Sequence, residues 1–176
     1  MPVTIPRFAA PIATLSLALA CAVTPAAHAS TVTSTCSQAD LPLPDPACTP
    51  GALNPDVTQA TIGSTICVSG WTATIRPSTS YTNALKRQGI VDYGYRDTSM
   101  SDYEEDHFLP LELGGAPKDP KNLWPEPHSG DENAYGKDSV ENAVKKAVCA
   151  GQASLSDAQD AMLTDWTTAE SVLGIG

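Results

Sequence analysis

Residues 103–137, YEEDHFLPLELGGAPKDPKNLWPEPHSGDENAYGK, decide the fold. Residues 103–113 predict a strand followed by a loop, and the glycines at 114–115 predict a tight turn. A second short strand is expected at 122–124 (NLW), and residues 129–131 (SGD) are typical of a helix start. The stretch therefore predicts a hairpin followed directly by a helix.

Two helices are expected after this hairpin. Apolar residues recur at helical spacing through residues 132–150, and Gly151 follows as a stop signal. Residues 154–157 (SLSD) carry the start signal of a final helix. The expected buried positions are Ala134, Val140, Ala143, Val144, Ala147 and Val148 in the first helix, and Leu155, Ala158, Ala161, Met162 and Trp166 in the second.

The N-terminal half gives shorter signals. Residues 64–68 (STICV) and 71–75 (WTATI) favour short strands, because β-branched side chains are common there. Residues 81–89 favour one short helix that Gly89 stops.

The chain is expected to contain one domain. Residues 30–46 are rich in Thr, Ser and Pro and predict an extended N-terminal arm. Residues 47–170 form the single domain, with its hairpin-helix core at 103–150, and residues 171–176 form a flexible tail. The predicted class is α+β, a small disulfide-stabilised domain with short N-terminal strands and C-terminal helices.

Charge and hydropathy each argue against one broad class of protein. The 176 residues carry 20 acidic and 10 basic side chains, a formal net charge of −10. A general electrostatic nucleic-acid binder is excluded, so contact with a polyanion needs a local basic patch or a bound cation. The most basic region, residues 76–96, is either a solvated face or that patch. No apolar run reaches the roughly 18–20 residues of a spanning helix, which argues against an integral membrane protein.

The first 29 residues resemble a secretory signal peptide. One arginine precedes an apolar run at 8–23, and AHA at 27–29 is typical of a cleavage site after Ala29. A membrane anchor is the first alternative, but the run is short and broken by Pro11. A lipoprotein signal at Cys21 is the second, although the preceding residues fit its motif poorly. We expect a secreted or periplasmic protein without a membrane attachment after cleavage.

Four cysteines remain beyond the predicted cleavage site. An even count in an exported chain predicts two disulfides, with three possible pairings. The expected pairing is Cys48 with Cys67, a short loop, which leaves Cys36 with Cys149. No CxxC pair is present, so a zinc knuckle is not expected.

Asp106 and His107 are the residues that most directly suggest chemistry. A carboxylate binds Mg²⁺ or a similar divalent ion, and a neutral imidazole takes a proton from water near neutral pH. A metal ion with a general base is the minimal apparatus for phosphodiester hydrolysis. In an extended strand the two side chains point to opposite faces, so a shared site needs the strand to end or bulge there.

The stretch resembles the HNH, or ββα-metal, endonucleases. The matching pattern is DH-x-x-PL-x-x-GG at residues 106–115, then NL at 122–123, then N-x-x-x-K at 133–137. The resemblance covers about 35 residues of the core. Other parts, such as NLWPEP at 122–127, are similar to a group of exported bacterial HNH-like proteins.

The resemblance implies a role for each matching residue. Asp106 and Asn133 would bind the metal, His107 would be the general base, and Asn122 would brace the loop and orient that histidine. Lys137 would contact a phosphate or stabilise the departing oxygen.

Two further residues have lower rank. Glu104 would support the site from behind the ligands, and His128 is a lower-ranked metal candidate because it precedes the helix. The alternatives without a role in a site are a solvated acid for Glu104, an exposed loop residue for His128 and a solvated helix residue for Lys137.

The expected function is a secreted, metal-dependent endonuclease that hydrolyses phosphodiester bonds of DNA or RNA without sequence specificity. The cofactor would be one divalent ion, Mg²⁺ first and Mn²⁺ or Zn²⁺ as alternatives, and the protein would act as a monomer. The alternative is a non-catalytic secreted binding module on the same scaffold. The acidity favours it, and so does the asparagine at residue 133, because the family places a histidine or an asparagine ligand there and an asparagine is the weaker ligand.

Overall fold

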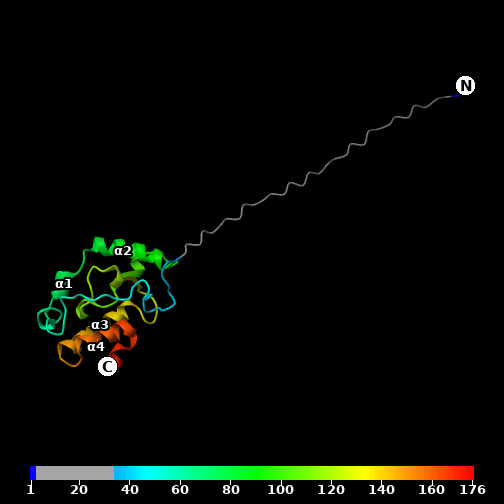
Figure 1. Cartoon of the computed structure of the whole chain (residues 1–176). Coiled ribbons are helices and arrows are strands. Elements are labelled where there is room, and N and C mark those ends of the chain that lie inside the picture. The colour runs from blue at the N-terminus through cyan, green and yellow to red at the C-terminus, as the bar shows by residue number, and fades with distance from the viewer. Residues whose placement is uncertain (3–33) are drawn as a thin grey trace. The chain divides into compact units, whose positions relative to one another are not determined.

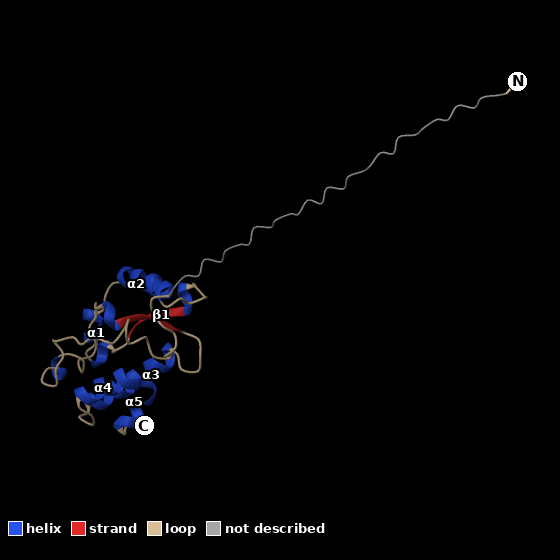
Figure 2. Cartoon of the chain, turned by 45° about the vertical axis from the view of Figure 1, so that its right-hand side comes forward, coloured by secondary structure: helices blue, strands red, loops and turns tan. Residues whose placement is uncertain are grey.

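An antiparallel hairpin lies at the centre of the fold in a computed structural model that describes residues 1–2 and 34–176. Its strands are β1 (Tyr103–His107) and β2 (Leu123–Pro127). In the register, Asp106 pairs with Trp124 and His107 with Leu123. Figure 2 shows β1 between helix α2 on one side and helices α3, α4 and α5 on the other. The class is therefore mixed helix and sheet, as expected.

Helix α2 (Thr79–Asp92) packs on both strands of the hairpin. The prediction that Gly89 ends this helix was wrong, because the helix continues through it. A Cβ at Gly89 would lie 2.7 Å from Cδ of Pro125, so glycine allows the helix to approach β2 closely. The residue serves packing rather than helix termination.

Helices α3 (Ala134–Cys149) and α4 (Leu155–Asp165) pack against each other on the other side of the hairpin (Figure 1). The Ser154 side chain caps α4 by accepting from the backbone N–H of Asp157, and Gly151 takes φ +74° after α3. Both signals were predicted from the sequence. The whole predicted face of α4 is buried, and α3 buries Ala134, Val144, Ala147 and Val148.

The prediction of two short N-terminal strands was wrong. Ser64 ends a 3-10 helix at Ile62–Ser64, residues 65–68 form turns and a bend, and residues 71–75 form helix α1 (Trp71–Ile75). Gly70 precedes α1 at φ +79° and redirects the chain. Strand propensity depends on a partner for pairing, and tertiary context overrides it here.

The predicted disulfide pairing was also wrong. The bonds join Cys36 to Cys48 and Cys67 to Cys149, with Cα–Cα distances of 6.0 and 5.6 Å. The backbone N–H of Cys36 donates to the carbonyl of Asp92, which fixes the first cysteine beside the end of α2. The first bond closes a shorter segment than the expected pair, with a sequence separation of 12, whereas the second joins cysteines with a separation of 82.

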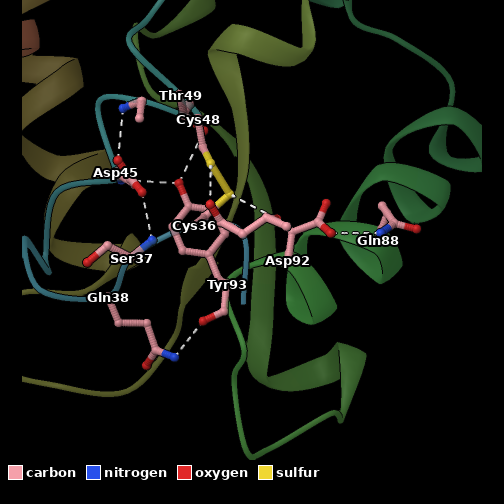
Figure 3. Close-up of a disulfide and its surroundings, with 11 residues drawn as sticks. Cys36, Ser37, Gln38, Asp45, Cys48, Thr49, Gln88, Asp92 and Tyr93 are labelled. Atoms are coloured by element: carbon pink, nitrogen blue, oxygen red, sulfur yellow. Dashed lines mark hydrogen bonds between the residues drawn. A yellow bond between two sulfur atoms is a disulfide. The ribbon is translucent and has the colours of Figure 1, made fainter. Parts of the chain in front are cut away.

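The segment predicted as an extended arm is tied down where the structure describes it. Figure 3 shows the first disulfide beside Tyr93, whose hydroxyl contacts Thr49 Oγ1 at 3.2 Å and accepts from the backbone N–H of Asp45 at 3.2 Å. The Asp45 carboxylate accepts from the backbone N–H of Ser37 at 2.7 Å. Residues 34–46 thus belong to the domain. The expected signal peptide lies almost wholly outside the described residues.

The C-terminal end stays helical longer than expected. Helix α5 (Ala169–Leu173) follows a 3-10 helix at Trp166–Thr168, and Ala169 and Trp166 are buried. Within the described residues, no helix has the length and apolarity that crossing a membrane requires. The two disulfides fit an oxidising compartment.

Candidate functional site

Asn122 holds the loop that joins the two strands. Its side chain is fully buried, and Oδ1 accepts from the backbone N–H of Leu109 at 2.8 Å and of Ala52 at 3.3 Å. Its Nδ2 donates to the carbonyls of Leu109 at 2.9 Å and Ala116 at 3.1 Å. One amide therefore satisfies four backbone groups and ties residues 52, 109 and 116 together.

His107 lies at the end of β1 with its ring orientation fixed. Its Nε2 lies 3.1 Å from the carbonyl oxygen of Pro117. A carbonyl only accepts, so Nε2 carries the proton and Nδ1 keeps its lone pair in the neutral ring. Burial lowers the pKa of His107 below its ordinary value, against the hydrogen bond to Pro117 and the charge of Asp106, which raise it. The ring is therefore a neutral base near pH 7.

His107 lines a cleft of about 360 Å³ between the start of α2 and the hairpin. A smaller hollow of about 160 Å³ shares Arg76 with it, and Asp138 and Glu141 of α3 also line this hollow. Besides Tyr103, the polar residues that line the main cleft are Arg76, Thr79, Thr82, Asn83, Lys86, Glu104, Glu105, His107 and His128.

Arg76 is the exposed cation of this cleft. Within the described part of the chain it forms no ion pair, while Lys86 is engaged by the carbonyls of Met100 and Tyr103 at 2.9 and 2.8 Å. The guanidinium is among the charges that lower the pKa of His107. A planar fork of donors suits a phosphate group.

Lys137 lies inside the protein, not at its surface. Its side chain is 1% exposed, and Nζ donates to Oδ2 of Asp106 at 2.6 Å, to the carbonyl of His107 at 3.0 Å and to Glu141. Burial opposes its charge, but Asp106 and Glu141 together raise the pKa of the ammonium. Its donors are directed at three protein acceptors, so the structure does not place it against a phosphate.

Glu126 is a second buried acid beside this ion pair. It is 1% exposed, and neither carboxylate oxygen has a hydrogen-bond partner among the described residues. Burial, and then the charge of Asp106, raise the pKa of Glu126, while Lys137 lowers it. A carboxyl group in this position is held in its neutral form at pH 7.

The residues expected to bind a metal ion do not fit one as they are placed. The Asp106 carboxylate is engaged by Lys137, and Asn133 Oδ1 caps α3 by accepting from the backbone N–H groups of Tyr135 and Gly136. Across residues 34–176, no three Cys, His, Asp or Glu side chains are grouped to hold a metal ion. Asp106 and Lys137 are brought together, whereas Asn133 is used elsewhere.

Glu104 and His128 lie together on the rim of the cleft. His128 Nε2 is 3.9 Å from Oε2 of Glu104, and His128 Nδ1 donates to the carbonyl of Ser101 at 3.1 Å. The His128 ring stacks on Tyr135, with centroids 5.0 Å apart. Burial, and then the charge of Asp106, raise the pKa of Glu104. Both residues therefore line the same cleft as His107.

Sequence reasoning did not assign site roles to Arg76, Glu126 or Glu141. Arg76 was noticed only as part of a basic region, and Glu126 falls between two prolines. Glu141 follows Lys137 by four residues, a spacing that places both on one helix face and could have indicated the pair.

No protein-family model matches the chain, and searches of curated proteins and of solved structures gave no significant match.

Proposed function

We propose that the protein is an exported phosphodiesterase that cleaves nucleic acid, with His107 as its general base. The observation that carries the proposal is the hydrogen bond from His107 Nε2 to the Pro117 carbonyl, which leaves Nδ1 as the basic nitrogen of a residue that lines the same cleft as Arg76. A phosphodiester is an anion, and Arg76 is an unpaired cation at that cleft among the described residues. A base and a cation together meet the two needs of phosphoryl chemistry.

The mechanism follows from these groups. Nδ1 of His107 accepts the proton of the attacking hydroxyl as its oxygen bonds to phosphorus. The bond from phosphorus to the leaving ester oxygen breaks, and that oxygen takes up a proton. The Arg76 guanidinium binds the phosphate and balances the charge that develops on its oxygens. Lys137 and Asn122 are positioning residues, because they hold the end of β1 and the following loop in place.

An HNH-like arrangement remains part of the proposal. The hairpin followed by α3 and the bracing by Asn122 support it. The divalent ion implied by the resemblance would supply a positive charge at the phosphate, but the engaged Asp106 and Asn133 do not fit it. No step is assigned to that ion. Export through a signal peptide cleaved after Ala29, and action as a monomer, complete the proposal.

A second candidate is a non-catalytic binding module on the same scaffold. The observation that favours it is the internal use of Asp106, whose ion pair with the buried Lys137 ties the hairpin to α3. In that case the cleft binds an anionic ligand through Arg76 without reaction.

The experiment measures cleavage and binding separately. Purified protein is incubated with labelled single-stranded and duplex DNA and RNA, with EDTA or with Mg²⁺, Mn²⁺ or Zn²⁺. The nuclease proposal expects cleavage that His107→Ala reduces at least about 100-fold while binding measured by fluorescence anisotropy persists. Binding without cleavage under every condition supports the module, and Arg87→Ala, at an exposed arginine of α2, is the matched control for Arg76→Ala.

A further inference from the structure

We propose that the substrate is single-stranded RNA and that the attacking group is the ribose 2′-hydroxyl, with no divalent ion required. This inference rests on the proposed function and names the substrate class of the same cleft.

The first step of the argument is the place of Lys137. Its ammonium sits between Asp106 and Glu141 and its side chain is 1% exposed, so it occupies the position beside Asp106 where a metal ion would bind. Oδ2 of Asp106 is engaged at 2.6 Å. The carboxylate that would hold a metal ion is therefore already used by Lys137. A metal ion that activates water is not supported by these residues as they are placed.

The second step is the choice of nucleophile. The 2′-hydroxyl of RNA is held beside its own phosphorus, and an intramolecular nucleophile gains a large effective concentration without a metal ion. DNA lacks this group. His107 Nδ1 keeps its lone pair because Nε2 donates to Pro117, so the base that such a reaction needs is present.

The third step is the path of the protons. The 2′-hydroxyl gives its proton to Nδ1 of His107 while its oxygen bonds to phosphorus. The bond from phosphorus to O5′ breaks, and O5′ takes a proton from Nε2 of protonated His128, which lines the same cleft. The products are a 2′,3′-cyclic phosphate and a 5′-hydroxyl, and Arg76 balances the charge on the phosphate oxygens.

An exposed aromatic ring beside the cleft fits an unpaired base. Tyr135 is 61% exposed, and its ring stacks on His128 with centroids 5.0 Å apart. Unpaired bases stack on exposed aromatic side chains, and such stacking is typical of proteins that bind single strands. Tyr135 therefore offers an exposed ring for a base of the strand, in contact with the cleft residue His128.

The test uses the full chain with three labelled oligonucleotides of one sequence in EDTA. They are all-RNA, all-DNA, and RNA with a single 2′-deoxy nucleotide at the main cleavage position. We expect cleavage of the RNA with a cyclic phosphate product, no cleavage of the DNA, and protection of the single substituted position. His128→Ala and Tyr135→Ala slow RNA cleavage at least about 10-fold, while Val172→Ala, at an exposed residue of α5, does not.

Failure of the inference is distinct from failure of the proposed function. Cleavage that EDTA abolishes, cleavage of the DNA at a similar rate, or a product with a 5′-phosphate overturns the inference and leaves the nuclease proposal intact. Absence of cleavage for every nucleic acid with every ion overturns both.

Discussion

Nζ of Lys137 lies 2.6 Å from Oδ2 of Asp106, and this buried ion pair joins α3 to the end of β1. The same ammonium donates to the backbone carbonyl of His107 at 3.0 Å. The position of His107 therefore depends on the hydrogen bond from Lys137 to its backbone carbonyl. Stability and site geometry are coupled at this point.

Lys137→Met is expected to destabilise the protein strongly. The change leaves Asp106 and Glu141 without their counter-charge beside the buried Glu126, and breaking a buried pair from one side costs about 3–5 kcal/mol. Urea unfolding gives the free energy. Lys146→Met, at an exposed lysine of the same helix, is the control. Equal effects of the two substitutions would contradict a structural role for the buried ammonium.

Asn122→Ala is expected to lower the free energy of unfolding by about 3 kcal/mol, because several buried backbone groups lose their partner. Asn142 is a matched control, since it is exposed and donates only to the carbonyl of Asp138. Thermal unfolding of both variants measures the difference. If Asn122→Ala unfolds at the same temperature as the wild type, the hydrogen bonds of the Asn122 amide do not stabilise the fold.

The two disulfides are expected to contribute unequally. The bonds close segments with sequence separations of 12 and 82. Loop-closure entropy gives about 3 kcal/mol for the Cys36–Cys48 bond and about 4.5 kcal/mol for the Cys67–Cys149 bond. Unfolding of Cys48→Ser and Cys67→Ser variants measures the two losses. Peptide mapping of the oxidised protein checks the pairing, and a peptide joining Cys48 to Cys67 would contradict the fold.

Glu105 predicts a pH dependence of stability. Burial, with a smaller contribution from Asp106, raises the pKa of Glu105 to about 8, although Lys86 lowers it. A carboxyl with a raised folded-state pKa stabilises the fold at low pH, and this contribution is lost as pH rises from about 4.5 to 8.

We therefore expect the free energy of unfolding of Glu105→Gln to increase relative to that of the wild type as pH rises, by up to about 1.4 kcal/mol per pH unit. Urea unfolding of both proteins at pH 5, 6.5 and 8 tests this. Glu170→Gln serves as the control for loss of a carboxylate. A constant difference between wild type and Glu105→Gln across the range would contradict the burial of Glu105 in its neutral form.

Local signals predicted the parts of the fold that local chemistry decides. Ser154 was recognised as a helix start because a cap acts within one turn, and the buried face of α4 followed from helical spacing. The hairpin was found because two short strands flank a turn-rich loop. Gly89 was misread because its packing against Pro125 involves a residue 36 positions away.

The candidate site was predictable only in part, for the same reason. Asn122 was expected to brace the loop, and the structure shows its amide hydrogen-bonded to the backbone of Leu109. Lys137 looked like a solvated or substrate-facing residue, because a helix sequence does not show that Asp106 lies opposite. The cysteine pairs also depend on how distant segments fold together.

The central claim is that His107 is the general base, and the pH profile of cleavage tests it most directly. A general base with a lowered pKa sets the acid side of the profile, so we predict cleavage that rises with pH through a half-maximal point below about pH 6.5. We also predict that His107→Ala cleaves at least about 100-fold more slowly and lacks this step. A His107→Ala variant that keeps the wild-type rate and the same acid limb would contradict the account.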